Sequence, residues 1–171
     1  SDVYKRQVLL LLQQEKGIRL DQACLGIVGV GHVGSRIQHL GERLGMRILL
    51  NDPPRADRGE KGFADLHTLA QECDILTFHT PLIREGSYAT YHLADESFFK
   101  SLTRRPFIIN TSRGEVIDTG AILHALDSKQ IAGAVLDVWE HEPNINLELL
   151  DKVFIGTPHI LSLIHISEPT R

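Results

Sequence analysis

Short, almost wholly apolar runs alternate along this chain with segments of helical pattern, and this alternation constrains the fold more than any other feature. The apolar runs are CLGIVG, RILLN, DILTF, FIIN, AGAVLDV and VFIG. Helices are predicted between them at 32–44, 65–71, 95–102 and 119–128, the last with Asp118 as its N-cap. Strands without a polar face are typical of a parallel sheet that helices cover on both sides. The sequence therefore predicts a doubly wound α/β domain, in which ligands bind at the carboxyl ends of the strands.

Composition and charge exclude several classes of partner. The 171 residues suffice for one domain with a hydrophobic core, and 18 basic against 22 acidic residues give a net charge of −4 without a basic run. This balance argues against nucleic acid as a partner. The one long apolar run, VLLLL, is far too short to cross a bilayer, and no signal peptide is recognisable. We therefore expect a cytoplasmic protein with no membrane partner.

The cysteines and histidines show no metal-binding spacing. Cys24 and Cys73 are the two cysteines, and without a C-x-x-C pair they are expected to be buried thiols in a reducing compartment. The histidines that might attract attention are also irregularly spaced: His79, His92, His124 and His141. No metal site is predicted.

The segment GVGHVG places Gly29, Gly31 and Gly34 in a G-x-G-x-x-G pattern. Glycine triplets occur by chance, but this one follows a predicted strand and opens a predicted helix, as in a dinucleotide-binding turn. There the first glycine permits a tight turn, the second lets a pyrophosphate approach, and the third packs helix against strand. The helix N-terminus near His32 and Val33 would offer free N–H groups to the phosphates.

Asp52 ends the next predicted strand. A carboxylate there can accept hydrogen bonds from a ribose 2′-hydroxyl and would repel a 2′-phosphate, which favours NAD over NADP. Arg55 and Arg58 follow closely and could instead hold that phosphate, although a solvated loop is the simpler interpretation. A tight turn without a ligand and an S-adenosylmethionine site are the alternatives for the whole pattern.

Three polar residues follow consecutive late strands: Arg113 after FIIN, Glu142 after AGAVLDV and His159 after VFIG. The ends of neighbouring parallel strands face one crevice, so these side chains are expected to lie close together. Arginine can hold a carboxylate with two hydrogen bonds. Histidine can exchange a proton with an alcohol or carbonyl oxygen, and a carboxylate can orient its ring. Taken singly, an arginine such as Arg113 is more often a surface charge, and a histidine such as His159 after Pro158 is more often a loop residue.

The segments GIVGVGHVG, NTSRGEVID, LDVWEHEP and IGTPHI together resemble the D-2-hydroxyacid dehydrogenases, over nearly all of 8–160. The resemblance implies an NAD-binding Rossmann domain and places the family's catalytic arginine, glutamate and histidine at Arg113, Glu142 and His159. It further implies cofactor contacts at or beside Thr80, Thr111, Ser112 and Asp137. Without the resemblance, Thr80 could be a capping hydroxyl and Asp137 the acceptor of a hydrogen bond at the end of a strand.

The segments NDPPRADRGE, DILTFHTPL and LELLDKVFIGTPHI narrow the resemblance within the family. They are similar to members that oxidise a phosphorylated 2-hydroxy acid in pyridoxal 5′-phosphate (vitamin B6) biosynthesis. This resemblance implies a small phosphorylated substrate and a homodimer in the complete enzyme.

The two ends of the chain differ from the family. SDVYKRQ and SLIHISEPTR resemble translated sequencing-adapter sequence, and the AG expected after TPHI is missing. We therefore expect artefacts at 1–7 and 161–171, an interdomain helix at 8–20 and the NAD-binding domain at 21–160. The family's substrate domain would then be absent and the fragment inactive by itself. The VLLLL helix, made to face another domain or subunit, would be exposed.

Two other functions stay open from the sequence. The chain could belong to a different D-2-hydroxyacid dehydrogenase, acting on phosphoglycerate or on glyoxylate and hydroxypyruvate. It could also be an NAD-sensing binding protein, like the transcriptional corepressors that share this fold.

Overall fold

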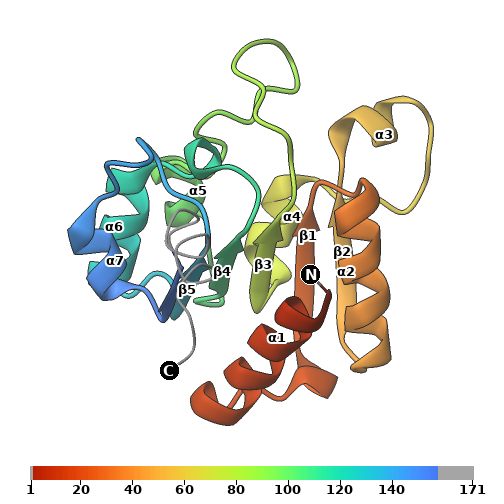
Figure 1. Cartoon of the computed structure of the whole chain (residues 1–171). Helices are drawn as coiled ribbons and strands as arrows, with labels where there is room; N and C mark the ends of the chain where they lie inside the picture. The colour runs from red at the N-terminus through yellow and green to blue at the C-terminus, as the bar shows by residue number, and fades with distance from the viewer. Residues whose placement is uncertain (1, 158–171) are drawn as a thin grey trace, which may run out of the picture.

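Six parallel strands form one sheet in the computed structural model, which describes residues 2–157 (Figure 1). The spatial order is β2-β1-β3-β4-β5-β6. The strands are β1 (Cys24–Val28), β2 (Arg47–Asn51), β3 (Ile75–Phe78), β4 (Phe107–Asn110), β5 (Gly133–Leu136) and β6 (Ile155–Gly156). The chain runs from β1 to β2 at one edge and then crosses back to β3 on the other side of β1. The crevice of this fold is therefore expected where β1 and β3 end. The predicted strands and fold class are confirmed.

Helices cover both faces of the sheet (Figure 1). They are α1 (Asp2–Lys16), α2 (His32–Arg43), α3 (Pro53–Asp57), α4 (Leu66–Glu72), α5 (Glu96–Lys100), α6 (Thr119–Asp127) and α7 (Leu147–Lys152). Single 3-10 turns lie at Leu20–Gln22 and Gly114–Val116. The four predicted helices are present, and the Asp118 side chain accepts from the N–H of Ala121 as the predicted N-cap. The sequence interpretation missed α7 and also α3, which begins with two prolines inside a segment expected to be a loop.

Helix α1 packs on the sheet, so the expectation that the VLLLL segment is exposed is wrong for most of it, although Leu11 is exposed. Val8, Leu9 and Leu12 are buried in the same cluster as Leu25 of β1 and Ile37 of α2. These three residues of α1 share one helical face, and β1 needs an apolar cover on that side because it is buried along its whole length. The helix also runs without a break across the boundary predicted at residue 7.

The two cysteines confirm the expected buried thiols. Cys24 at the start of β1 and Cys73 at the end of α4 are free, and their sulfur atoms lie 3.7 Å apart. The contact with Cys24 and burial raise the pKa of Cys73, so this thiol stays neutral. Among residues 2–157, no helix is long and apolar enough to cross a membrane, and no three His, Cys, Asp or Glu side chains gather as metal ligands would.

His79, just after β3, should make the stability of the domain depend on pH. Burial and, to a smaller degree, the charge of Lys5 lower the pKa of His79 from 6.5 to about 4. The folded state therefore favours the neutral ring, while the unfolded chain takes up a proton near pH 6.5. This stabilisation is complete above pH 6.5 and falls by about 1.4 kcal/mol per pH unit as the pH drops towards 4.

Urea unfolding at pH 7, 6 and 5 measures this effect, with His79→Gln as the control. Other groups titrate identically in both proteins, so the wild-type chain should lose more stability than the variant. Equal losses would contradict the assignment.

Candidate functional site

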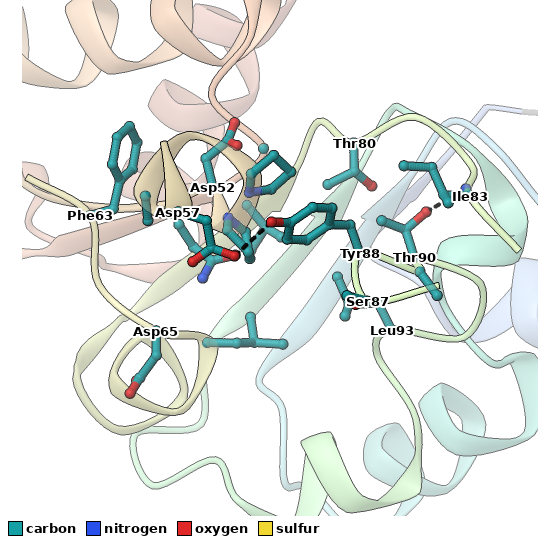
Figure 2. Close-up of a pocket in the computed structure, with 18 of the residues that line it drawn as sticks. Asp52, Asp57, Phe63, Asp65, Thr80, Ile83, Ser87, Tyr88, Thr90 and Leu93 are labelled. Atoms are coloured by element: carbon teal, nitrogen blue, oxygen red, sulfur yellow. Dashed lines mark hydrogen bonds between the residues drawn. The ribbon is translucent and has the colours of Figure 1, made fainter. Parts of the chain in front are cut away.

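A cavity of about 430 Å³ opens at the carboxyl ends of β1, β2 and β3 (Figure 2). Its walls come from the glycine turn after β1, from α3 and the segment that follows it, and from the loop after β3. The lining includes Gly29, Asp52, Asp57, Phe63, Thr80 and Tyr88. The position matches the crevice expected from the strand order, and the volume suits a ligand of drug size.

The three glycines of the predicted turn differ in what surrounds them. Gly29 has φ +90°, and a Cβ there would lie 2.6 Å from the carbonyl oxygen of His79. A Cβ at Gly34 would lie 2.2 Å from the carbonyl oxygen of Gly29, so the fold itself requires both glycines. A Cβ at Gly31 would meet no atom of the described residues within 4 Å. Gly31 therefore leaves an open cradle at the start of α2.

The N-terminus of α2 faces this cradle without a side-chain cap. Gly31 occupies the N-cap position, and within the described part of the chain no side chain hydrogen-bonds there. His32 and Val33 form the first turn and are exposed. The free N–H groups of a twelve-residue helix carry the positive end of its dipole, which suits an anionic group such as a pyrophosphate.

The Asp52 carboxylate ties the end of β2 to the glycine turn. One oxygen accepts from the N–H of Val30 at 2.9 Å, and the other accepts from the N–H of Arg55 at 3.2 Å and caps α3. A carboxylate has about four acceptor positions, so Asp52 retains capacity for a ribose hydroxyl at the cavity. The sequence predicted the ribose contact but not the two backbone bonds that fix the side chain.

The two arginines after Asp52 are engaged elsewhere. Arg55 donates to the carbonyl oxygen of Val30 at 2.6 Å and to Glu60 at 3.0 Å. Arg58 pairs with the same Glu60 at 3.2 Å. Neither arginine lines the cavity, whereas the acidic residues Asp52 and Asp57 do. The cavity therefore suits a ribose with a free 2′-hydroxyl better than one carrying a 2′-phosphate.

Thr80 has a buried hydroxyl without a partner among the residues that the structure describes. The residue follows β3 and lines the cavity, with its methyl group near Gly29. A buried polar atom costs free energy unless a hydrogen bond satisfies it. A ligand in the crevice that offers such a bond would remove this cost.

Asn110, the last residue of β4, shapes the loop that carries Arg113. Its amide donates to the carbonyl oxygen of Arg113 at 2.9 Å, and its oxygen accepts from the N–H and the hydroxyl of Ser112 at 3.1 and 2.8 Å. Asn110 is only 1% exposed, whereas Arg113 is exposed. Sequence analysis did not single out Asn110. The available signal was a polar residue ending an otherwise apolar strand.

The loop after β5 docks against the Arg113 loop. A Cβ on Gly114 would lie 2.0 Å from the carbonyl carbon of Trp139, so the two backbones are in direct contact. Glu140, with a side chain only 7% exposed, accepts from the N–H and hydroxyl of Thr119 at 2.8 and 2.9 Å. Its second oxygen is hydrogen-bonded to His92 Nε2 at 2.8 Å. Glu140 thus joins the loop after β5 to the start of α6 and to the loop after β3. Glu142 lies two residues further along the chain.

Glu142 itself is exposed, and one of its carboxylate oxygens accepts from the N–H of Trp139 at 2.9 Å. Asp137 directly follows β5. Its N–H donates to the carbonyl oxygen of Asn110 at 3.1 Å, and its side chain accepts from the Thr157 hydroxyl.

Thr111 follows Asn110 and faces α1 rather than the cavity of Figure 2. His159 lies outside the described residues, so its approach to Arg113 and Glu142 stays a prediction.

Comparison with known proteins places these features in a family. Residues 5–161 match the family model described as D-isomer specific 2-hydroxyacid dehydrogenase, NAD binding domain. An erythronate-4-phosphate dehydrogenase of Bacteroides fragilis is 56% identical over 158 residues, which are 92% of this chain and 45% of that protein. One from Escherichia coli is 54% identical over 153 residues, 89% of this chain and 40% of that protein. The chain thus spans less than half the length of these relatives.

Solved structures of related enzymes have the same fold. D-lactate dehydrogenase from Aquifex aeolicus, solved with NAD and lactic acid, is 30% identical with a TM-score of 0.70, covering 91% of this chain and 55% of its own. Apo D-mandelate dehydrogenase from Rhodotorula graminis is also 30% identical, with a TM-score of 0.72 and coverages of 90% and 46%.

Proposed function

This chain belongs to the D-isomer specific 2-hydroxyacid dehydrogenases and contains their NAD-binding domain, and from this we propose the reaction that it serves. We propose that the full-length enzyme oxidises 4-phospho-D-erythronate to 2-oxo-3-hydroxy-4-phosphobutanoate, a step of pyridoxal 5′-phosphate biosynthesis. The support comes from relatives named for this activity, which share more than half of the matched residues with this chain. The lactate and mandelate dehydrogenases share under a third.

The cofactor site would use four features of the crevice. The cradle at Gly31 and the first turn of α2 would hold the pyrophosphate, Asp52 the adenosine ribose, and the cavity of Figure 2 the adenine. Thr80 would donate a hydrogen bond from its unpartnered hydroxyl to the bound dinucleotide. The observation that carries the assignment is the cradle at Gly31, which is open and faces an uncapped helix N-terminus.

NAD supplies the acceptor for the hydride that leaves C2 of the substrate. Arg113 would bind the substrate carboxylate with two charge-assisted hydrogen bonds and polarise the C2 oxygen. His159 would accept the proton of the C2 hydroxyl as a general base, and Glu142 would hydrogen-bond the other ring nitrogen and favour the protonated form.

Titration of the chain with NADH tests the cofactor half of the proposal. We expect saturable binding of NADH and much weaker binding of NADPH, because the cavity presents carboxylates and both nearby arginines are paired with Glu60. Gly31→Ala should weaken NADH binding about tenfold or more while the free energy of unfolding changes by less than about 1 kcal/mol.

The contrasting variant is Gly34→Ala, in which the new methyl group meets the carbonyl oxygen of Gly29. That substitution should destabilise the fold as well as weaken binding. Unchanged NADH affinity in Gly31→Ala would place the pyrophosphate elsewhere. A folded wild-type chain that binds neither dinucleotide would remove the cofactor site as described.

The substrate half needs the full-length protein. Residues 8–160 of this chain can replace the matching region of the Bacteroides fragilis relative, and the chimera can be assayed for NADH formation with a panel of 2-hydroxy acids. We expect efficient turnover only with 4-phospho-D-erythronate. Equal or better turnover of 3-phosphoglycerate or glycerate would favour another member of the family, and a folded, NADH-binding chimera with no turnover would favour a sensor.

We also propose that the full-length enzyme is a cytoplasmic homodimer. Two buried, unpaired cysteines suit a reducing compartment. Leu11 leaves apolar surface on the outer side of α1, being 37% exposed, which suits contact with another subunit or domain.

A further inference from the structure

The loop after β3 reaches across the mouth of the cavity and bonds to α3. This loop, residues 81–93, and α3 both project beyond the carboxyl ends of the strands (Figure 1). The hydroxyl of Tyr88, near the tip of the loop, donates to the Asp57 carboxylate at 2.6 Å, across a separation of 31 residues in sequence. Figure 2 shows the Tyr88 ring extended over the cavity towards Asp57, and both residues belong to its lining.

The base of the loop is closed by Thr90, which is only 8% exposed. Its hydroxyl donates to the carbonyl oxygen of Pro81 at 2.6 Å and accepts from the N–H of Ile83 at 2.8 Å. Its N–H donates to the carbonyl oxygen of Ile83 at 2.7 Å. These bonds make the loop a hairpin-like arm, so the direction in which Tyr88 points is set by buried contacts rather than by a free loop.

We propose that Tyr88 and Asp57 form a clasp that closes over the adenosine half of the bound dinucleotide. The proposal rests on the cofactor site proposed above. The cavity keeps a volume of about 430 Å³ while Tyr88 and Asp57 are in contact, so the clasp can stay shut while adenosine occupies it. Opening of the Tyr88–Asp57 bond would widen the path by which a dinucleotide leaves, which makes the clasp a determinant of how long the cofactor stays bound.

The chemistry of the two residues suits this role. The flat ring of a tyrosine offers an adenine base a stacking surface, and its hydroxyl bonds to a carboxylate more strongly than to a neutral acceptor. The hydrogen bond to Asp57, with smaller contributions from burial and the Asp57 charge, raises the pKa of Tyr88. The hydroxyl therefore remains a donor over the neutral and mildly alkaline range.

The test compares Tyr88→Phe, Asp57→Ala and the double variant of the same chain. Tyr88→Phe keeps the ring and removes only the hydroxyl. Stopped-flow dissociation of NADH and of ADP-ribose, which lacks the nicotinamide, should be about threefold to tenfold faster in each single variant. The double variant should dissociate no faster than the quicker single variant, because both substitutions remove the same bond. Tyr88→Ala should release both ligands faster still, since the ring is lost as well.

Tyr91→Phe is the matched control, since Tyr91 lies on the same loop, stacks on His92 and does not line the cavity. It should leave both dissociation rates unchanged. Normal release from Tyr88→Phe and Asp57→Ala, or multiplied effects in the double variant, would overturn the clasp while the cofactor site stands. Faster release of NADH but not of ADP-ribose would also overturn it. A folded wild-type chain that binds neither ligand would overturn the cofactor site and the clasp together.

Discussion

Arg113→Lys in the full-length chimera is expected to lower kcat/KM for 4-phospho-D-erythronate about 100-fold or more, with NADH affinity nearly unchanged. Lysine keeps the charge but cannot offer the two parallel N–H groups that grip a carboxylate. Arg113 does not line the cofactor cavity. Its loop follows β4 rather than β1 or β2, and the Asn110 amide holds the loop there by donating to the Arg113 carbonyl oxygen. Steady-state kinetics and NADH titration of the same preparation measure the two quantities separately.

Arg104→Lys provides the matched control at the opposite end of the same strand. Arg104 precedes β4 and donates to Asp74 at 2.9 Å on the exposed surface, far along the strand from the crevice. Its replacement should leave turnover close to that of the unmodified chimera. Turnover near the unmodified level in Arg113→Lys would remove this arginine from the proposed substrate site.

The strands could be predicted most directly at the centre of the sheet, because β1, β3, β4 and β5 are buried at every residue and therefore appear as almost uninterrupted apolar runs. The glycine turn could be predicted because its spacing is a local pattern, and Gly34 is confined by Gly29 of the same turn. The confinement of Gly29 by His79 could not be predicted in this way, because His79 follows β3. Helix α3 was missed because Pro and charged residues are typical of loops. In fact Asp52 caps this helix and the prolines occupy its first turn, where a missing N–H is harmless.

The placement of α1 could not be derived from its sequence, since an apolar helical face fits a sheet as well as another domain. The contacts that organise the site were also beyond local patterns. Tyr88 meets Asp57, and Glu140 joins Thr119 to His92, through loops that lack any periodicity. Such pairings depend on how elements distant in sequence are brought together. The sequence shows which residues could form hydrogen bonds, but it does not show which residue each of them contacts.

Gly114→Ala should be among the most damaging single substitutions in the described part of the chain. The added methyl group would lie 2.0 Å from the carbonyl carbon and 2.1 Å from the oxygen of Trp139, and both atoms belong to the backbone. The Arg113 loop and the Glu142 loop must separate to admit it. We expect the free energy of unfolding to fall by about 3 kcal/mol, the upper end of the usual range for overpacking.

Gly120→Ala tests whether a glycine replacement in this region is harmful in itself. Gly120 is exposed in the first turn of α6, and a Cβ there would lie 3.4 Å from the nearest atom, an Asp118 oxygen. This variant should be as stable as the wild type or gain up to about 1 kcal/mol, as alanine does over glycine in a helix. Urea unfolding of both variants at pH 7 makes the comparison. Equal stability of Gly114→Ala and Gly120→Ala would mean that the two loops are not in direct backbone contact.

The same pair of variants in the full-length chimera separates stability from catalysis. At a temperature where Gly114→Ala is still folded, turnover should be lost even though NADH binds, because Arg113 and Glu142 are placed by the loops that the methyl group forces apart. The hydrogen bonds of Glu140 should not restore the position of Arg113, because they hold the start of α6 rather than Arg113 itself. Turnover that survives in the folded Gly114→Ala chimera would show that the docking of the two loops stabilises the domain without setting the geometry of the reaction.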